Sequence, residues 1–197
     1  MIKTRSHILT FVDTETTGLD PYKHELISIG IIEVKETQSE QGLTHELLGE
    51  YEYKIKPERL DLADPIALKI NKYTEHDWVG AIGRQEALAV VGLHLIKPDQ
   101  TEPKINDVIV VGHNVHFDVL MIGAFFREGG QGWNPRHALD TYTLARKILR
   151  KDIDVESYAL GSLCNYYGVD NEMAHTALSD TRACLELYQK LMAVELV

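Results

Sequence analysis

Cysteine is scarce in this sequence, and long apolar runs are absent. The 197 residues include two cysteines, Cys164 and Cys184, and both fall within apolar stretches. A disulfide-rich scaffold is therefore excluded, no Cys/His spacing indicates a zinc site, and two buried thiols favour a reducing compartment. No apolar run approaches the roughly 20 residues that span a bilayer, and the polar N-terminus does not have the pattern of a secretion signal. We therefore expect a cytoplasmic protein.

Basic residues are outnumbered by acidic ones. The chain has 20 Lys and Arg against 30 Asp and Glu, which gives a net charge of −10. This balance argues against a broad basic face that grips a long nucleic-acid duplex. It does not exclude an enzyme that contacts phosphate through metal ions, because part of the negative charge would then be the metal site itself. The length and the 44% hydrophobic content fit one domain over residues 1–197.

Apolar runs rich in β-branched residues predict strands, and helical periodicity predicts helices after them. The expected strands cover residues 7–13, 26–34, 49–55, 108–111 and 138–140, with polar loops at 37–44 and 98–107. Short helices or loops are expected within 57–78, and longer helices over 84–97, 115–128, 141–149, 158–167 and from 177 to the end. Strands first, followed by strands alternating with helices, indicate an α/β domain with a mixed sheet.

Two acids close the first expected strand. Asp13 and Glu15 are two residues apart, so an extended strand places both carboxylates on one face, about 6–7 Å apart. Adjacent anions repel each other, and burying them is costly without a cation. A hard divalent ion such as Mg²⁺ would supply it. The alternative is a strand that ends in a solvated acidic turn.

Two more aspartates fall on apolar helix faces. Asp118 has Ile122 and Phe125 at helical spacing. The apolar residues at matching spacing around Asp180 are Ala177, Cys184, Leu187 and Leu191. A single helical aspartate is usually solvated, but two on apolar faces need partners, and few basic residues are available. Metal is an economical answer. His175 precedes Asp180 by five residues, where a lone histidine is more often a cap or a core residue.

Three motifs together carry a resemblance to a known family. They are DTETTGL at residues 13–19, GHNVHFD at 112–118 and HTALSD at 175–180. In order and spacing they resemble the three exonuclease motifs of the DEDDh family, which includes the proofreading subunit of bacterial replicative polymerase, ribonuclease T and oligoribonuclease. The resemblance runs from about residue 7 to residue 188. It implies a ribonuclease H-like fold, in which a five-stranded mixed sheet has an antiparallel meander of strands one to three, then parallel strands four and five, with flanking helices.

The resemblance also implies roles for five residues. Asp13, Glu15 and Asp180 would hold one divalent ion, Mg²⁺ or Mn²⁺, and Asp13 would be shared with a second. Asp118 would support the second ion through water. His175 would be the general base that takes a proton from the attacking water. Two ions about 3.5–4 Å apart would straddle the scissile phosphate.

The expected substrate contacts are less specific. Gly18 would let the backbone approach the terminal nucleotide, Thr16 would hydrogen-bond its sugar or phosphate, and Leu19 would wedge beside its base. Phe117 either stacks under that base or belongs to the core. Asn114 is expected to cap the following helix rather than to contact substrate.

Two further stretches leave alternatives open. Residues 71–74 fall where relatives line the nucleotide pocket. The densest basic cluster is expected to be a solvated helix face, with nucleic-acid strand binding as the second interpretation; it consists of Arg146, Lys147, Arg150 and Lys151.

The predicted function is a 3′→5′ exonuclease that releases nucleoside 5′-monophosphates from single-stranded or frayed DNA ends. One alternative is an exoribonuclease of the ribonuclease T or oligoribonuclease type. Another is a non-catalytic module that binds a nucleic-acid end or a polymerase. Partners would be nucleic acid with a free 3′ end, most readily single-stranded DNA, and a DNA polymerase. The chain ends soon after its last expected helix, which favours a free-standing exonuclease over a tethered one.

Overall fold

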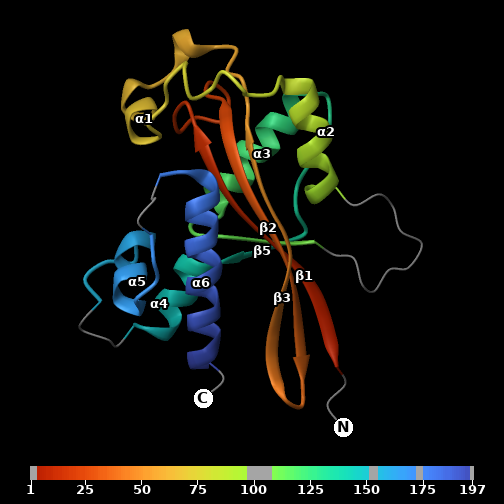
Figure 1. Ribbon diagram of the computed structural model, residues 1–197, viewed down its shortest axis with the longest axis vertical. Helices are drawn as coiled ribbons and strands as arrows, with labels where there is room; N and C mark the ends of the chain where they lie inside the picture. Colours follow the sequence, from red (N-terminus) through yellow and green to blue (C-terminus); the bar gives the residue numbers. More distant parts are fainter. Residues whose placement is uncertain (1–3, 97–107, 151–154, 172–174, 196–197) are drawn as a thin grey trace.

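The computed structural model describes residues 4–96, 108–150, 155–171 and 175–195. Its centre is a five-stranded sheet with the order β3-β2-β1-β4-β5 (Figure 1). The strands are β1 (Arg5–Thr16), β2 (Leu26–Ser39), β3 (Gly42–Lys54), β4 (Ile109–Gly112) and β5 (His137–Asp140). β1, β2 and β3 pair antiparallel, whereas β4 pairs parallel to β1 and β5 parallel to β4. The predicted mixed sheet is confirmed.

The hairpin of β2 and β3 is longer than predicted. Residues 37–44 were expected to form a loop, but the ladder continues to the pair Ser39–Gly42, so that prediction is wrong. This end of the hairpin extends beyond the helices in Figure 1, and its side chains are partly or fully exposed. Its polar composition therefore reflects solvation of a strand, while β-branched Thr37 and Thr44 face each other across the ladder.

The helices follow the expected order. They are the 3₁₀ turn η1 (Leu60–Leu62), α1 (Pro65–Ile70), α2 (Arg84–Leu95), α3 (His116–Glu128), α4 (Thr141–Ile148), α5 (Leu160–Tyr167) and α6 (Ala177–Glu195). The loop predicted at 98–107 lies outside the described residues. Among the residues that the structure describes, none of the helices is both long and apolar enough to cross a membrane.

The two faces of the sheet have separate cores. On one face, Val12, Ile29 and Ile31 pack against α2 and α3. On the other, Phe11 and Ile32 pack with Cys184 and Tyr188 of α6, which lies along β1 and β2 (Figure 1). Because side chains alternate along a strand, Asp13 and Glu15 continue the row of Phe11 and point to the α6 side.

A glycine lets α6 come close to the sheet. Gly30 of β2 pairs with Asp13, and a β-carbon at Gly30 would collide with the carbonyl group of Ala177 and the side chain of Thr181. The first turn of α6 therefore lies directly on the sheet beside Asp13. This close approach brings Asp180 to the acids of β1.

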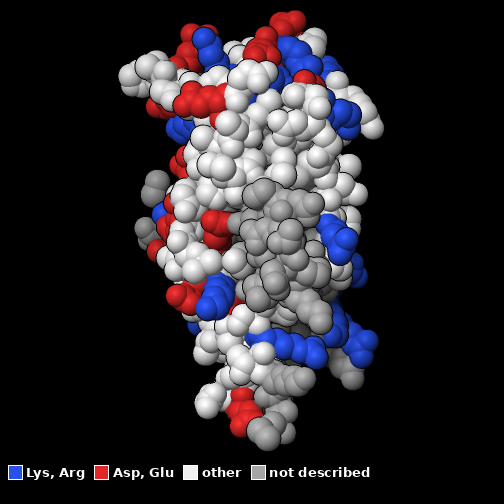
Figure 2. All heavy atoms as spheres, turned by 90° about the vertical axis from the view of Figure 1, so that its right-hand side faces the viewer, with Lys and Arg blue, Asp and Glu red and all other residues white. Residues whose placement is uncertain are grey.

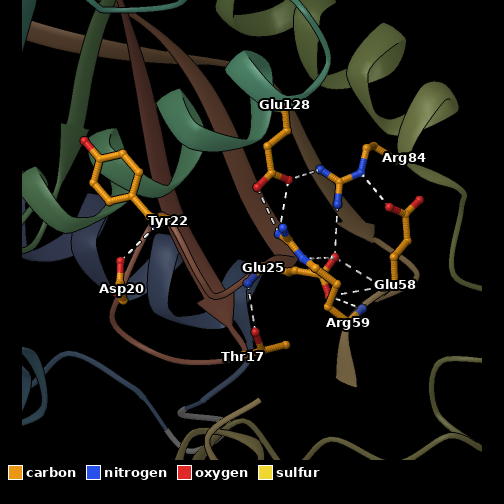
Figure 3. A network of polar contacts seen from close by, with 8 residues as sticks. All are labelled: Thr17, Asp20, Tyr22, Glu25, Glu58, Arg59, Arg84 and Glu128. Atoms are coloured by element: carbon orange, nitrogen blue, oxygen red, sulfur yellow. Dashed lines mark hydrogen bonds and ion pairs between the residues drawn. The ribbon is translucent and has the colours of Figure 1, made fainter. Parts of the chain in front are cut away.

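A buried carboxylate joins three segments near the end of β1 (Figure 3). The Glu25 side chain is 3% exposed and accepts hydrogen bonds from the backbone N–H groups of Glu58, at 3.1 Å, and Arg59, at 2.7 Å. Arg84 of α2 donates to the same carboxylate at 3.0 Å and also pairs with Glu58 and with Glu128 at the end of α3. Both charges of the Glu25–Arg84 pair are thus compensated inside the protein.

The backbone of Glu25 fixes the turn that follows the two acids. Its carbonyl group accepts from the N–H of Thr17 at 2.8 Å, and its own N–H donates to the Thr17 hydroxyl at 2.8 Å. The carbonyl of Thr17 accepts from the N–H of Asp64, just before α1. Glu25 therefore connects the turn at residues 16–19 to α2 and to the segment at Glu58 and Arg59.

Glu25→Ala is expected to lower the free energy of unfolding by about 1–3 kcal/mol, because it leaves two backbone N–H groups and Nη2 of Arg84 without their acceptor. Arg84 keeps its pairs with Glu58 and Glu128, so its charge stays compensated. Urea unfolding measures this. Arg182→Ala serves as the control, since its pair with Glu50 is exposed, at 52% and 29% of the side chains, and such pairs contribute about 0–1 kcal/mol. Equal losses in the two variants would show that the Glu25 network does not stabilise the fold as described.

Candidate active site

Three carboxylates from two elements meet at the edge of the α6 layer. Asp13 and Glu15 of β1 and Asp180 of α6 each offer a carboxylate oxygen, and these atoms all lie within 4.8 Å of one another. All three side chains are partly buried. Asp180 lies in the first turn of α6, where the N-terminal end of the helix dipole favours negative charge. Converging carboxylate oxygens are the donor set of a hard divalent cation, so the residues fit such an ion.

Asp118 lies beside this cluster. It is in the first turn of α3, is 4% exposed, and its Oδ1 accepts a hydrogen bond from the Thr14 hydroxyl at 2.7 Å. Thr14 points to the α3 face of the sheet, so it links Asp118 to the strand that carries Asp13 and Glu15. The structure thus brings the four predicted acids to one place.

Three of these acids, Asp13, Glu15 and Asp118, have raised pKa values. Burial, followed by the charges of Asp118, Asp180 and Glu15, raises the pKa of Asp13 well above its ordinary value. Burial and the charge of Asp180 raise the pKa of Glu15 to about 7. Burial also raises the pKa of Asp118 to about 7, against the opposing effect of its hydrogen bond from Thr14. Ionising these carboxylates near neutral pH therefore costs free energy, and a bound cation would offset that cost.

These pKa values predict a pH-dependent stability. Because the folded-state pKa values of Asp13, Glu15 and Asp118 are raised, the folded protein binds more protons than the unfolded chain between about pH 4 and 7. The free energy of unfolding in EDTA should therefore fall as the pH rises from about 5 to 7.5. MgCl₂ should raise Tm more at pH 7.5 than at pH 5, because it binds the ionised form.

Thermal unfolding with and without EDTA measures this dependence. Glu15→Gln is the matched control, because it removes one of the shifted groups and should flatten the pH dependence relative to the unmodified protein. If the two proteins show the same pH dependence in EDTA, Glu15 does not carry the shifted pKa.

His175 is tied to the cluster through its backbone. Its φ is 73°, in the left-handed region, and its N–H donates to Oδ2 of Asp180 at 3.0 Å. Its side chain is exposed and lines, together with Glu15, a cleft of about 680 Å³. One carboxylate therefore faces the acids of β1 and also fixes the backbone of the predicted base.

The predicted substrate contacts lie around the turn after β1. The buried Thr16 hydroxyl donates to the carbonyl group of Gly18 at 2.8 Å, so its hydrogen is used within the turn. A β-carbon at Gly18 would collide with the His24 ring, which explains the glycine there. Leu19 is 78% exposed, and Phe117 is half-buried. Leu19, in the turn that follows the two acids, is therefore available to a ligand.

Asn114 does not cap α3. The residue that precedes the helix is Val115, without a side-chain cap, and Asn114 takes φ 60°. Its N–H donates to Oδ1 of Asp140 at 2.8 Å, while Asp140 also caps α4. The capping prediction is therefore wrong. Thr14 lies inside the first motif, and residues 139–141 are a secondary match to the family, but the contacts of Thr14 with Asp118 and of Asp140 with Asn114 follow only from the tertiary structure.

The two remaining polar stretches, residues 71–74 and the described part of the basic cluster at 146–151, lie beside the turn after β1 and on the exposed side of α4, respectively. Asn71 donates to the carbonyl group of Thr16 at 2.7 Å, and Lys72 lines the cleft. Arg146 lies over the rings of Tyr142 and Tyr158, with the rest of the basic cluster exposed apart from Lys151, which is not described. On the face drawn in Figure 2, the Lys and Arg side chains of described residues form small groups separated by uncharged and acidic surface.

Comparison with known proteins places this geometry in a family. The exonuclease family model RNase_T matches residues 10–188. The chain is 28% identical over 186 residues to a PolC-type DNA polymerase III of Thermotoga maritima, covering 93% of this chain and 12% of that protein. It is 28% identical over 189 residues to ribonuclease T of Haemophilus influenzae, covering 93% of this chain and 79% of that protein.

The fold is that of a solved exonuclease. Escherichia coli exonuclease I, in complex with a dT13 oligonucleotide, superposes with a TM-score of 0.73 at 18% identity, covering 96% of this chain and 42% of that one. The chain thus spans less than half the length of exonuclease I and about an eighth of the polymerase. The ribonuclease H-like fold and the predicted family are confirmed: the chain belongs to the exonuclease family, of the DEDD type.

Proposed function

We propose that this protein is a metal-dependent 3′→5′ exonuclease that hydrolyses the phosphodiester bond at the 3′ end of single-stranded or frayed DNA and releases nucleoside 5′-monophosphates. The observation that carries the proposal is the convergence of Asp13, Glu15 and Asp180 within 4.8 Å, in a chain of the exonuclease family. Residues 1–197 would form one exonuclease domain, which the single sheet with helices on both faces supports.

The acids would hold the metal. Asp13, Glu15 and Asp180 would bind one divalent cation, Mg²⁺ or Mn²⁺, and Asp13 would be shared with a second that Asp118 supports through water. Two such ions supply Lewis-acid stabilisation of the charge on the phosphate oxygens. The raised pKa values of Asp13, Glu15 and Asp118 support this, because they mark buried carboxylates whose ionised forms a cation would stabilise.

His175 would act as the general base. Its side chain lines the cleft with Glu15, and its backbone is held by Asp180. The oxygen of water attacks phosphorus, its proton passes to the imidazole, and the bond from phosphorus to the 3′ oxygen of the preceding nucleotide breaks. The electron pair leaves with that 3′ oxygen, which is then protonated.

The turn after β1 would receive the terminal nucleotide. Gly18, Leu19 and Phe117 are the residues that we assign to this contact, and Leu19 offers the most accessible apolar surface. Thr16 would hold the turn in place, because its buried hydroxyl donates to the carbonyl group of Gly18. Hydrogen bonds from Glu25 and Asn71 to the backbone or hydroxyl groups of this turn support a preformed contact surface.

The choice between DNA and RNA rests on the relatives. The PolC-type relative is a DNA polymerase and the structural neighbour holds dT13, which supports DNA and a polymerase as a partner. Ribonuclease T is the second candidate, because the chain spans 79% of its length rather than a small part. Discrimination depends on how the site treats the 2′-hydroxyl group.

Matched DNA and RNA oligonucleotides of one sequence test the proposal. With Mg²⁺ and a 5′ label, we expect both the loss of nucleotides from the 3′ end and a faster rate on DNA. A faster rate on RNA would favour the exoribonuclease. If the folded protein degrades neither oligonucleotide in the presence of Mg²⁺, the proposal of an enzyme is wrong, and a module that binds nucleic-acid ends becomes the better hypothesis.

A further inference from the structure

A buried hydroxyl group faces the cleft beside the acids. Ser28 of β2 is 2% exposed, and its Oγ has no hydrogen-bond partner among the described residues. It lines the same cleft as Glu15 and His175. Leaving a buried polar group unpaired costs about 1–3 kcal/mol, and such groups in native proteins usually have a partner in a ligand or an ordered water.

The register of the sheet aims Ser28 at the acidic cluster. Ser28 pairs with Glu15 across the β1–β2 ladder, so their side chains share a face, with β-carbons about 4.5–5.5 Å apart. The next residue of β2 on this face is Gly30, opposite Asp13, which has no side chain. Of these two β2 residues, Ser28 alone can offer a polar atom to the acids of β1.

A second buried hydroxyl in the same sheet provides a contrast. Thr10 of β1 is fully buried, and its Oγ1 also has no partner among the described residues. Alternation along β1 places Thr10 on the face of Val12, away from Asp13 and Glu15, and it does not line the cleft. Ser28 therefore differs from Thr10 in its position on the face of the acids, although both residues have an unpaired hydroxyl group.

We propose that Ser28 is a positioning residue of the metal site: its Oγ accepts a hydrogen bond from a water molecule of the hydration shell of the cation held at Glu15. This inference rests on the proposed function. Among the described residues the Ser28 Oγ has no direct partner, and a bridging water would pair it. Mg²⁺ and Mn²⁺ sites of this kind keep water in their shell, and that water donates its hydrogens outward. The cleft of about 680 Å³ has room for it.

Calorimetric titration with Mn²⁺, without nucleic acid, tests the role directly. Ser28→Ala should weaken Mn²⁺ binding about tenfold, as the loss of an outer-sphere contact does at other metal sites. Ser28→Thr keeps the hydroxyl group and should bind Mn²⁺ nearly as the unmodified protein does. Thr10→Val, the matched control, removes the other unpaired hydroxyl and should leave the affinity unchanged.

Urea unfolding in EDTA separates positioning from structure. Without metal, Ser28→Ala should be at least as stable as the unmodified protein, because the variant buries no unpaired hydroxyl. Equal Mn²⁺ affinity in Ser28→Ala and the unmodified protein would overturn the role of Ser28 and leave the proposed function intact. A loss of stability in EDTA that matches the loss of affinity would also overturn it. If the unmodified protein binds no Mn²⁺, both proposals fail.

Discussion

Asp13→Asn should reduce the rate of 3′-end hydrolysis about 10³-fold or more. The substitution keeps the size of the side chain and removes the charge that interacts with all three other acids. Metal ions contribute several kcal/mol of charge stabilisation to phosphoryl transfer, and each 1.36 kcal/mol is tenfold in rate. Initial rates on a 5′-labelled DNA oligonucleotide with Mg²⁺ measure the loss. Asp180→Asn should behave in the same way.

Glu46→Gln is the matched control for this loss. It removes the same charge from β3, where Glu46 is 68% exposed and pairs only loosely with Lys35, at 3.7 Å, so full activity is expected. In EDTA, Asp13→Asn should also unfold at a higher urea concentration than the unmodified protein at pH 7.5, because one of the repelling charges is gone. Full Mg²⁺-dependent activity in Asp13→Asn would remove Asp13 from the metal site.

The second large effect concerns the base. His175→Asn should lower kcat about 10²–10⁴-fold, the usual contribution of general base catalysis, while Mn²⁺ affinity stays close to that of the unmodified protein. Asparagine is chosen because His175 has φ 73°, a conformation that asparagine tolerates better than most residues. The backbone N–H that donates to Asp180 is kept, so the cluster should remain in place.

Single-turnover kinetics and calorimetry on the same variant separate the two roles. Loss of turnover with retained Mn²⁺ binding supports a base that does not hold the metal. Unchanged turnover would remove His175 from catalysis. Loss of Mn²⁺ binding would instead place His175 among the groups that organise the metal site.

Much of the acidic cluster could be predicted because short-range rules govern it. Alternation in a strand places Asp13 and Glu15 on one face, and helical spacing places Asp118 and Asp180 on buried faces. The motifs then identify the family, which the match over residues 10–188 confirms. The order of elements predicts a mixed sheet, and the family resemblance implies its antiparallel meander and parallel strands. The polar end of the β2–β3 hairpin was missed, because a solvated strand has the composition of a loop.

The supporting contacts could not be predicted, because they depend on pairing between distant segments. Thr14 meets Asp118 104 positions later, and Arg84 meets Glu25 59 positions earlier. Ser28 is recognised as a candidate for the metal site only because it pairs with Glu15 across the β1–β2 ladder. Asn114 shows the limit of a local rule, since a residue with a strong capping preference instead takes a left-handed turn that Asp140 holds.

The most direct measurement is a time course on single-stranded DNA labelled at its 5′ end, with Mg²⁺ and in a parallel reaction with EDTA. A metal-dependent 3′→5′ exonuclease produces a ladder that shortens one nucleotide at a time and releases nucleoside 5′-monophosphates, and EDTA abolishes it. An oligonucleotide blocked at its 3′ hydroxyl group should be degraded much more slowly. A ladder that persists in EDTA, or immediate loss of the 5′ label as a mononucleotide, would contradict the assignment of the acidic cluster to 3′-end hydrolysis.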